Sequence, residues 1–241
     1  MSKGEESVTA DPYEDQPGPI TAEVAADGAL TPELVASVLA ASVRTEDAAA
    51  AGTATGVVLR IGGAPPAARV AWPGAVRIGE VNKWEAALRR LEQVPAPVVA
   101  VVDGDAYGPA AELLLVADYR IMAVGTVFEL AAVDGAVWPA MAMYRLAAQL
   151  GAGPARRLAV LGRPRTAEQA HADGLIDAVV APGAETEAVG AGLALFGRSA
   201  GTEIAIRRRL LLDAPGTRFE DALGAHLAAG DRALRRERAA S

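Results

Sequence analysis

The chain has 241 residues, of which 51% are hydrophobic, so it can bury a substantial core in one large α/β domain. It contains no cysteine, which excludes disulfides, thiolate metal sites and cysteine nucleophiles, and its two histidines argue against a metal site. The net charge of −7, without a dense basic stripe, argues against nucleic acid as a partner. No apolar run approaches about 18 residues. The N-terminus lacks the apolar core of a signal peptide, so we expect a soluble cytoplasmic protein with no membrane partner.

The predicted elements alternate between strands and helices along the chain. Thr31 followed by Pro32 is typical of a helix start, because threonine caps a helix and proline suits its first position. The apolar run over 98–102 is typical of a central parallel strand. Residues 64–80, with three prolines, predict a long irregular loop. Further strands are predicted over 20–25, 56–63, 119–124, 126–130 and 175–180, and further helices over 81–94, 110–118, 140–150, 153–162 and 166–174.

This alternation predicts an α/β fold with mostly parallel strand pairing. We divide the chain into a disordered leader over 1–18, a core over 19–184 and a C-terminal helical region over 185–241. The helical region breaks near Pro215 and contains more apolar residues than a solvated tail needs. It packs either on its own core or on a neighbouring subunit, and the second alternative predicts an oligomer.

Two short patterns are weaker candidates for chemistry. Residues 197–201 match the G-x-S-x-G nucleophile elbow of hydrolases, with Asp213, Asp221 and His226 downstream. That elbow needs a strand before the serine, and the preceding segment is better interpreted as a helix, so we favour a chance match. The carboxylates of 103–105 suggest a cation site, but no further acids follow at the spacing of a calcium loop, and turn chemistry explains them better.

The segment 95–118 places a buried strand, a turn and a helix start close together, with Glu112 in the helix's first turns. Free N–H groups at a helix start can hold the oxyanion that develops when a thioester enolises. A carboxylate one turn further can move a proton or act on a hydroxyl. Apolar neighbours predict that Glu112 is partly buried with a raised pKa. The alternative is that Glu112 only complements the helix dipole.

The same segment carries a signature pattern. Its positions are Pro97, Val98, Ala100, Gly104, Ala106, Gly108, Glu112, Leu113, Ala117 and Asp118. Together with TAEQAHADGLIDAVV over 166–180, this pattern resembles the crotonase (enoyl-CoA hydratase/isomerase) superfamily over about residues 20–235. The resemblance implies a spiral of ββα turns, a C-terminal helical region that forms trimers or hexamers, and a CoA thioester as substrate without a further cofactor.

The resemblance also implies the roles of the site residues. Glu112 would act on the water or hydroxyl, and Gly108, Pro109 and Ala110 would surround the thioester oxygen. Pro109 stands where the family has a glycine whose N–H is an oxyanion donor, and proline has no N–H. The second catalytic glutamate of hydratases falls at Ala132, and residues 64–74 show no counterpart of the first oxyanion loop. These departures imply a degenerate active site.

Within the superfamily, three stretches resemble a smaller branch, the divergent B subunit of the dehydratase that helps form 3,5-dihydroxyphenylacetyl-CoA, a precursor of the antibiotic building block dihydroxyphenylglycine. They are VNKWEAALRRLE over 81–92, the turn over 103–105, and WPAMAMYRL over 138–146. The branch implies an acyl-CoA dehydratase for a polyketide-derived thioester. The alternative is a catalytically weak partner of a second crotonase or of a type III polyketide synthase. Arg44, Arg69 and Arg77 are candidates to contact the CoA phosphates, unless they are only solvated surface arginines.

Overall fold

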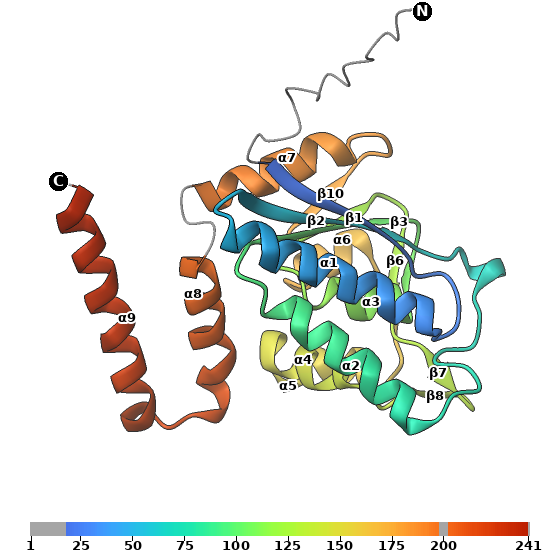
Figure 1. The fold of residues 1–241 in the computed structure, drawn as a ribbon. Helices are drawn as coiled ribbons and strands as arrows, with labels where there is room; N and C mark the ends of the chain where they lie inside the picture. The colour runs from blue at the N-terminus through green and yellow to red at the C-terminus, as the bar shows by residue number, and fades with distance from the viewer. Residues whose placement is uncertain (1–17, 198–201, 241) are drawn as a thin grey trace, which may run out of the picture.

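The computed structural model describes residues 18–197 and 202–240 (Figure 1). Its elements follow one another as β1 (Gly18–Ala25), α1 (Pro32–Ala50), β2 (Ala54–Gly62), a 3-10 turn (Pro66–Ala68), α2 (Ile78–Glu92), β3 (Val98–Asp103), β4 (Ala106–Tyr107), α3 (Pro109–Leu114), β5 (Tyr119–Ala123), β6 (Val127–Glu129), β7 (Ala132–Val133), β8 (Ala136–Val137), α4 (Met141–Leu150), α5 (Ala152–Ala159), β9 (Arg165–Thr166), α6 (Ala167–Ala172), β10 (Ala178–Val180), α7 (Glu185–Phe196), α8 (Thr202–Asp213), a 3-10 turn (Ala214–Gly216) and α9 (Phe219–Ala240).

The centre of the fold is a five-stranded sheet in the order β1-β2-β3-β5-β10, and every neighbouring pair in it is parallel. The prediction of an α/β fold with parallel pairing is therefore confirmed. β3 lies in the middle, and Val98–Val102 are all buried, because helices cover both faces of the strand. The apolar run over 98–102 correctly predicted this central strand.

Short strands build two smaller sheets, and of these strands only β6 lies within a predicted strand. β4 pairs in parallel with β6, β6 pairs antiparallel with β9, and β7 and β8 form a hairpin. Each has two or three residues, which is too short for an alternating apolar pattern to be visible. The strand expected over 126–130 shortens to β6, and the strand expected over 175–180 shortens to β10.

Helices cover the two faces of the parallel sheet. On one face, Val57, Leu59 and Ile61 of β2 belong to the main core with α1, α2 and α3. On the other face, Val58 of β2 contacts a smaller cluster with Val189 of α7. In Figure 1, α7 lies above the strands and α1 to α3 lie below them. α7 thus packs on the core, although it begins at the predicted start of the C-terminal helical region. At the other end, β1 begins at Gly18, the last residue of the predicted leader.

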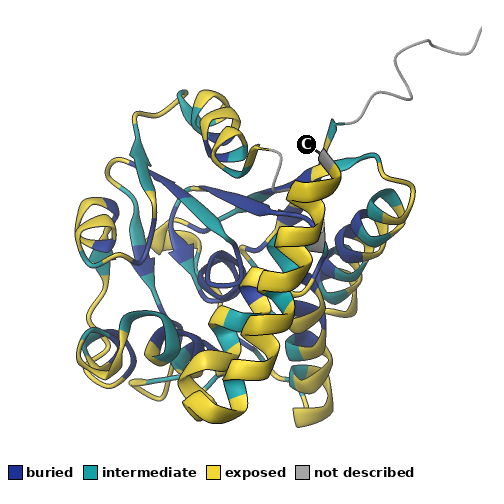
Figure 2. Cartoon of the chain, turned by 90° about the vertical axis from the view of Figure 1, so that its left-hand side faces the viewer, coloured by how far each residue is buried: buried dark blue, intermediate teal, exposed yellow. Residues whose placement is uncertain are grey.

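The remaining C-terminal helices stand beside the core. α8 is anchored by the buried Arg208, whereas α9 is exposed along most of its length (Figure 2). Glu203 of α8 forms ion pairs with Arg232 of α9 at 3.1 Å and with Arg236 of α9 at 2.5 Å. These ion pairs hold α8 and α9 together. The exposed large apolar side chains of α9 are Phe219, Leu223, Leu227 and Leu234. Their spacing places them on one face of the helix.

Two helix boundaries differ from the prediction near the site. α2 begins at Ile78, so the irregular loop is shorter than expected, and α3 ends at Leu114 and not near residue 118. Hydrogen bonds from side chains explain why α3 ends there. The carbonyl of Leu115 accepts hydrogen bonds from Arg120 Nη2 at 3.1 Å and from Gln149 Nε2 at 3.0 Å, so it needs no helical partner.

Candidate active site

α3 is a six-residue helix that is buried on every side. Because no face of it meets water, an apolar sequence is expected, and Glu112 is its only charged residue. The Glu112 residue is 3% exposed. A buried carboxyl is costly unless hydrogen bonds satisfy its oxygens, so its surroundings decide what it can do.

The sequence before Glu112 sets how α3 begins. Gly108 has φ 57° and ψ −118°, a conformation that favours glycine, and it places Pro109 at the first helical position, one residue before the predicted start of this helix. Pro109 contributes no N–H there. Ala110 therefore carries the first N–H of the helix, and all three residues lie within the same turn as Glu112.

Two indoles hold the Glu112 carboxyl. Trp72 Nε1 donates to Oε1 at 3.0 Å, and Trp84 Nε1 donates to Oε2 at 2.6 Å. Both tryptophans are 1% exposed, and their rings meet edge to face with centroids 5.5 Å apart. The predicted burial of Glu112 is confirmed. The indoles are a contact that sequence analysis missed, although Trp84 lies with Leu88 and Leu91 on the buried face of the helix that was predicted over 81–94.

Burial raises the pKa of Glu112 from its ordinary value of 4.5 to about 7. The hydrogen bonds from Trp84 and Trp72 oppose this rise, because N–H donors favour the carboxylate. Glu85 raises the pKa further and Arg145 lowers it. Near neutral pH the group is therefore present in both forms, as a proton donor and as a proton acceptor, which is the property that acid–base catalysis needs.

The raised pKa makes stability depend on pH. The folded-state pKa lies above the unfolded value, so the contribution of Glu112 to the free energy of unfolding is full below about pH 4.5 and is lost as the pH rises through about 7. At about 1.4 kcal/mol per pKa unit, the loss is about 3 kcal/mol. We expect denaturant titrations at about pH 5 and about pH 8 to show this loss in the wild type and not in Glu112→Gln. An equal loss in both proteins would contradict the raised pKa.

The loop that carries Trp72 is tied down by Arg69. Its guanidinium pairs with Asp105 at 3.1 Å and with Glu129 at 2.5 Å, and it lies 4.7 Å from the ring centroid of Tyr107. Asp105 also accepts from the N–H of Val127 at 2.9 Å, so it joins the loop to β6. These carboxylates neutralise Arg69, which disfavours its expected role at a CoA phosphate.

The other two arginine candidates lie on separate elements. Arg44 of α1 is exposed and donates to the carbonyl of Thr21 at 3.0 Å, and Arg77 is exposed at the start of α2. The carboxylates of the predicted turn also separate, because Asp103 is exposed while Asp105 is buried against Arg69. An ordinary turn and the ion pair of Asp105 with Arg69 therefore account for these two carboxylates.

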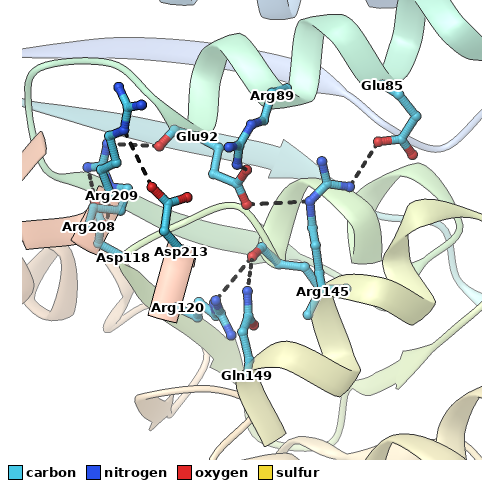
Figure 3. Close-up of polar contacts among 11 residues, drawn as sticks. Glu85, Arg89, Glu92, Asp118, Arg120, Arg145, Gln149, Arg208, Arg209 and Asp213 are labelled. Atoms are coloured by element: carbon cyan, nitrogen blue, oxygen red, sulfur yellow. Dashed lines mark hydrogen bonds and ion pairs between the residues drawn. The ribbon is translucent and has the colours of Figure 1, made fainter. Parts of the chain in front are cut away.

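An ion-pair network lies beside the site, between α2 and α4. Figure 3 shows Arg145 between Glu85, at 3.0 Å, and Glu92, at 3.5 Å. Arg89 pairs with the same Glu92 at 2.6 Å. This network supplies the two charges, Glu85 and Arg145, that act on Glu112 from outside its hydrogen bonds.

The remaining predicted positions do not join Glu112. Ala132 is exposed at the start of β7. Residues 198–201 of the possible nucleophile elbow lie outside the described residues, the segment before them is the helix α7, and His226 is exposed on α9. Within residues 18–197 and 202–240, no three metal-binding side chains gather at one place. No helix there is both long and apolar enough to cross a membrane.

Comparison with known proteins places this fold and site in a family. The model of the enoyl-CoA hydratase/isomerase family matches residues 79–194. A protein named enoyl-CoA-hydratase from Amycolatopsis orientalis is 44% identical over 214 residues, which cover 88% of this chain and 94% of that protein. The chain belongs to the enoyl-CoA hydratase/isomerase family. The matched range of this chain includes Glu112 and the whole of α3.

Solved structures confirm the crotonase fold of this family. An enoyl-CoA hydratase homologue from Streptomyces coelicolor A3(2) superimposes with a TM-score of 0.71 at 21% identity, over 98% of this chain and 92% of that one. Pseudomonas aeruginosa PA4980 gives a TM-score of 0.64 at 28% identity, over 83% and 88%. A (3,5-dihydroxyphenyl)acetyl-CoA 1,2-dioxygenase from Amycolatopsis orientalis is 38% identical over 93 residues, 39% of this chain and 21% of that protein.

Cavities at the surface of the described residues lie away from Glu112. Two of 360 and 270 Å³ flank Arg89 and Glu92, where α8 approaches α2 and α4. Neither these nor three others of 200, 340 and 520 Å³ include Glu112 among their lining residues. The absence of Glu112 from the lining of these five cavities agrees with its exposure of 3%.

Proposed function

We propose that this member of the enoyl-CoA hydratase/isomerase family is an acyl-CoA dehydratase that helps form 3,5-dihydroxyphenylacetyl-CoA from a polyketide-derived thioester. The observation that carries the proposal is the buried carboxyl of Glu112, held by two indole N–H groups, whose pKa is raised to about 7 so that it can donate and accept protons near neutral pH. The two relatives from Amycolatopsis orientalis support the substrate class, because one is named as an enoyl-CoA hydratase and the other as acting on this thioester.

One carboxyl is sufficient for the loss of water. As a carboxylate, Glu112 accepts a proton from the acidic carbon next to the thioester carbonyl, and as an acid it returns that proton to the hydroxyl group. The C–O bond breaks, water leaves, and Glu112 is again a carboxylate. Formation of an aromatic ring would supply driving force, so a weak oxyanion hole at Pro109 would be tolerable. No further cofactor is required.

The test compares the purified chain with the mixture of pathway enzymes. We expect the chain alone to dehydrate an enoyl-CoA hydration product or the cyclised pathway thioester, as detected by the absorbance of the new double bond or by mass spectrometry. Activity that appears only after addition of a second crotonase would contradict an independent enzyme and would support the second candidate function below.

Pro109 offers a test of the oxyanion hole. Pro109→Gly restores an N–H where the family has a donor, and we expect it to speed exchange of the α-proton of a bound acyl-CoA with solvent. A missing oxyanion donor costs about 10²- to 10³-fold in rate where it has been measured, so a gain of up to that size is possible. Exchange is measured by mass spectrometry in D₂O. Slower exchange would show that Ala110 is already the donor and that Pro109 supports it.

The second candidate function is a partner subunit with little chemistry of its own, in a hetero-complex with a second crotonase or with a type III polyketide synthase. Both Glu112 oxygens are engaged by indole N–H groups, Pro109 lacks a donor, and Ala132 replaces the second carboxylate. Each of these features favours a binding role. If the Glu112→Gln variant still raises the dehydratase activity of the partner enzyme, that result would support this function over the first.

We further propose that the chain forms a homo-oligomer, a trimer or hexamer, through its C-terminal helices. The apolar face of α9, formed by Phe219, Leu223, Leu227 and Leu234, is exposed and would be covered by another subunit. Light scattering is expected to give a multiple of the 24.6 kDa chain mass. A monodisperse species at the mass of one chain would contradict this proposal.

A further inference from the structure

The two indoles that hold Glu112 come from unlike parts of the chain. Trp84 lies within α2, on the same buried face as Leu88 and Leu91. Trp72 lies in the connection over 63–77, which contains one 3-10 turn and whose residues around that turn are exposed. A helix fixes the position of Trp84, whereas the position of Trp72 depends on how an irregular segment is held.

Trp72 covers Glu112 on the side of Gly108, the residue before α3. A Cβ atom built on Gly108 would lie 3.2 Å from Trp72 Cβ and 3.3 Å from its Cγ, so this side chain lies directly against the residue before α3. The Trp72 N–H donates to Oε1 of Glu112, and the Trp84 N–H donates to Oε2. Trp72 therefore occupies one side of Oε1, next to the start of α3, and it is the part of the site held by an irregular segment.

We propose that the two indoles have different roles in the reaction: Trp84 is a positioning residue that holds Oε2 of Glu112 throughout, while Trp72 occupies the place of the acyl group at Oε1 and leaves it when substrate binds. This inference rests on the proposed function. It explains how a carboxyl that is 3% exposed can act on a substrate, and why the described cavities do not include it.

Departure of Trp72 also determines where the proton of Glu112 lies. One of the two N–H groups that favour the carboxylate is then lost, so the pKa of Glu112 rises further. The proton then goes to Oε1, because Oε2 still accepts from Trp84. In this proposal Oε1 is the oxygen that the departing hydroxyl meets. The charged groups that act on Glu112 are Glu85 of α2 and Arg145 of α4, which oppose each other and are themselves paired at 3.0 Å.

Two matched variants test the different roles. Trp72→Phe and Trp84→Phe each keep an aromatic ring and remove one N–H from one oxygen of Glu112. The third tryptophan, Trp138, makes no hydrogen bond to Glu112, so Trp138→Phe is the control. Where Trp84→Phe fails to fold, a benzothienyl-alanine at position 84 keeps the shape of tryptophan and replaces only its N–H.

The first measurement is an infrared pH titration of the Glu112 carboxyl, identified by its absence in Glu112→Gln. In the free protein we expect both variants to raise the pKa and Trp138→Phe to leave it unchanged. With phenylacetyl-CoA bound, which has no hydroxyl to lose, we expect Trp72→Phe to match the wild type and Trp84→Phe still to titrate higher. An unchanged pKa in free Trp84→Phe would overturn the role of Trp84, and a difference at Trp72 that persists with the probe bound would overturn its displacement.

The second measurement follows Trp72 itself. In the double variant Trp84→Phe, Trp138→Phe, it is the one remaining tryptophan. We expect its emission to shift to the red on addition of phenylacetyl-CoA, with binding followed in parallel by calorimetry. Binding without a shift would overturn the displacement of Trp72. Absence of binding to the wild-type protein would overturn the proposed function instead, and the titration of the free protein would still decide the role of Trp84.

Discussion

Replacement of Glu112 by glutamine is expected to lower the rate of dehydration by about 10²- to 10⁴-fold, the range that a positioned acid–base group contributes. Glutamine has nearly the same size but neither accepts nor returns a proton. Because glutamine keeps the size of the side chain, we expect the loss in kcat, with the binding of phenylacetyl-CoA largely retained. Stopped-flow absorbance and calorimetry measure the two quantities separately.

A loss of folded protein must be separated from this loss of chemistry. In Glu112→Gln the amide oxygen can accept from one indole, and the amide NH₂ then faces the other N–H, which leaves a buried donor unpaired at a cost of about 1–3 kcal/mol. Glu92→Gln is the matched control, because it weakens the ion pairs of another buried carboxyl, to Arg89 and Arg145, and leaves Glu112 with both indoles. Its rate per folded molecule is expected to be close to that of the wild type. Full activity in Glu112→Gln would contradict the proposed role.

The parts of the fold that were predicted are those with a local signal. β3 is an unbroken apolar run, and the buried face of α2 repeats at helical spacing, so both were visible in the sequence. Glu112 was predicted to be buried because its neighbours in α3 are apolar. The hairpin of β7 and β8 was missed, because two-residue strands have no periodicity to detect.

The surroundings of Glu112 could not be predicted for a different reason. Trp72 is 40 positions before Glu112 and Trp84 is 28 positions before it, and these contacts depend on how a loop and a helix pack over α3. The loop has no pattern that orients Trp72. The sequence did offer one hint: the chain has only three tryptophans, and one lies in this loop while a second lies in this helix. A buried indole needs an acceptor, but the pattern alone does not say which one.

The contacts of Arg208, in the C-terminal helices, could not be predicted from the sequence either. Its replacement is expected to have the largest effect on the free energy of unfolding. Three consecutive arginines occupy 207–209, and sequence alone does not distinguish the buried one from its neighbours. In the structure, Arg208 donates to Asp118 through Nε at 2.8 Å, and to three carbonyls, those of Glu92 at 2.9 Å, Val94 at 2.8 Å and Ala96 at 2.8 Å. It thereby ties α8 to the end of α2 and the start of β3.

We expect Arg208→Ala to lower the free energy of unfolding by about 3–5 kcal/mol, because Asp118 and the three carbonyls lose their partner within the core. Arg209→Ala is the control: its side chain is 83% exposed and pairs with Asp213 at 3.5 Å, so a change below about 0.5 kcal/mol is expected. Denaturant titration measures both. If the stranded charge of Asp118 is the main cost, Arg208→Met combined with Asp118→Asn will be more stable than Arg208→Met alone. Equal effects of Arg208→Ala and Arg209→Ala would show that α8 is held to the core by its apolar contacts and not by Arg208.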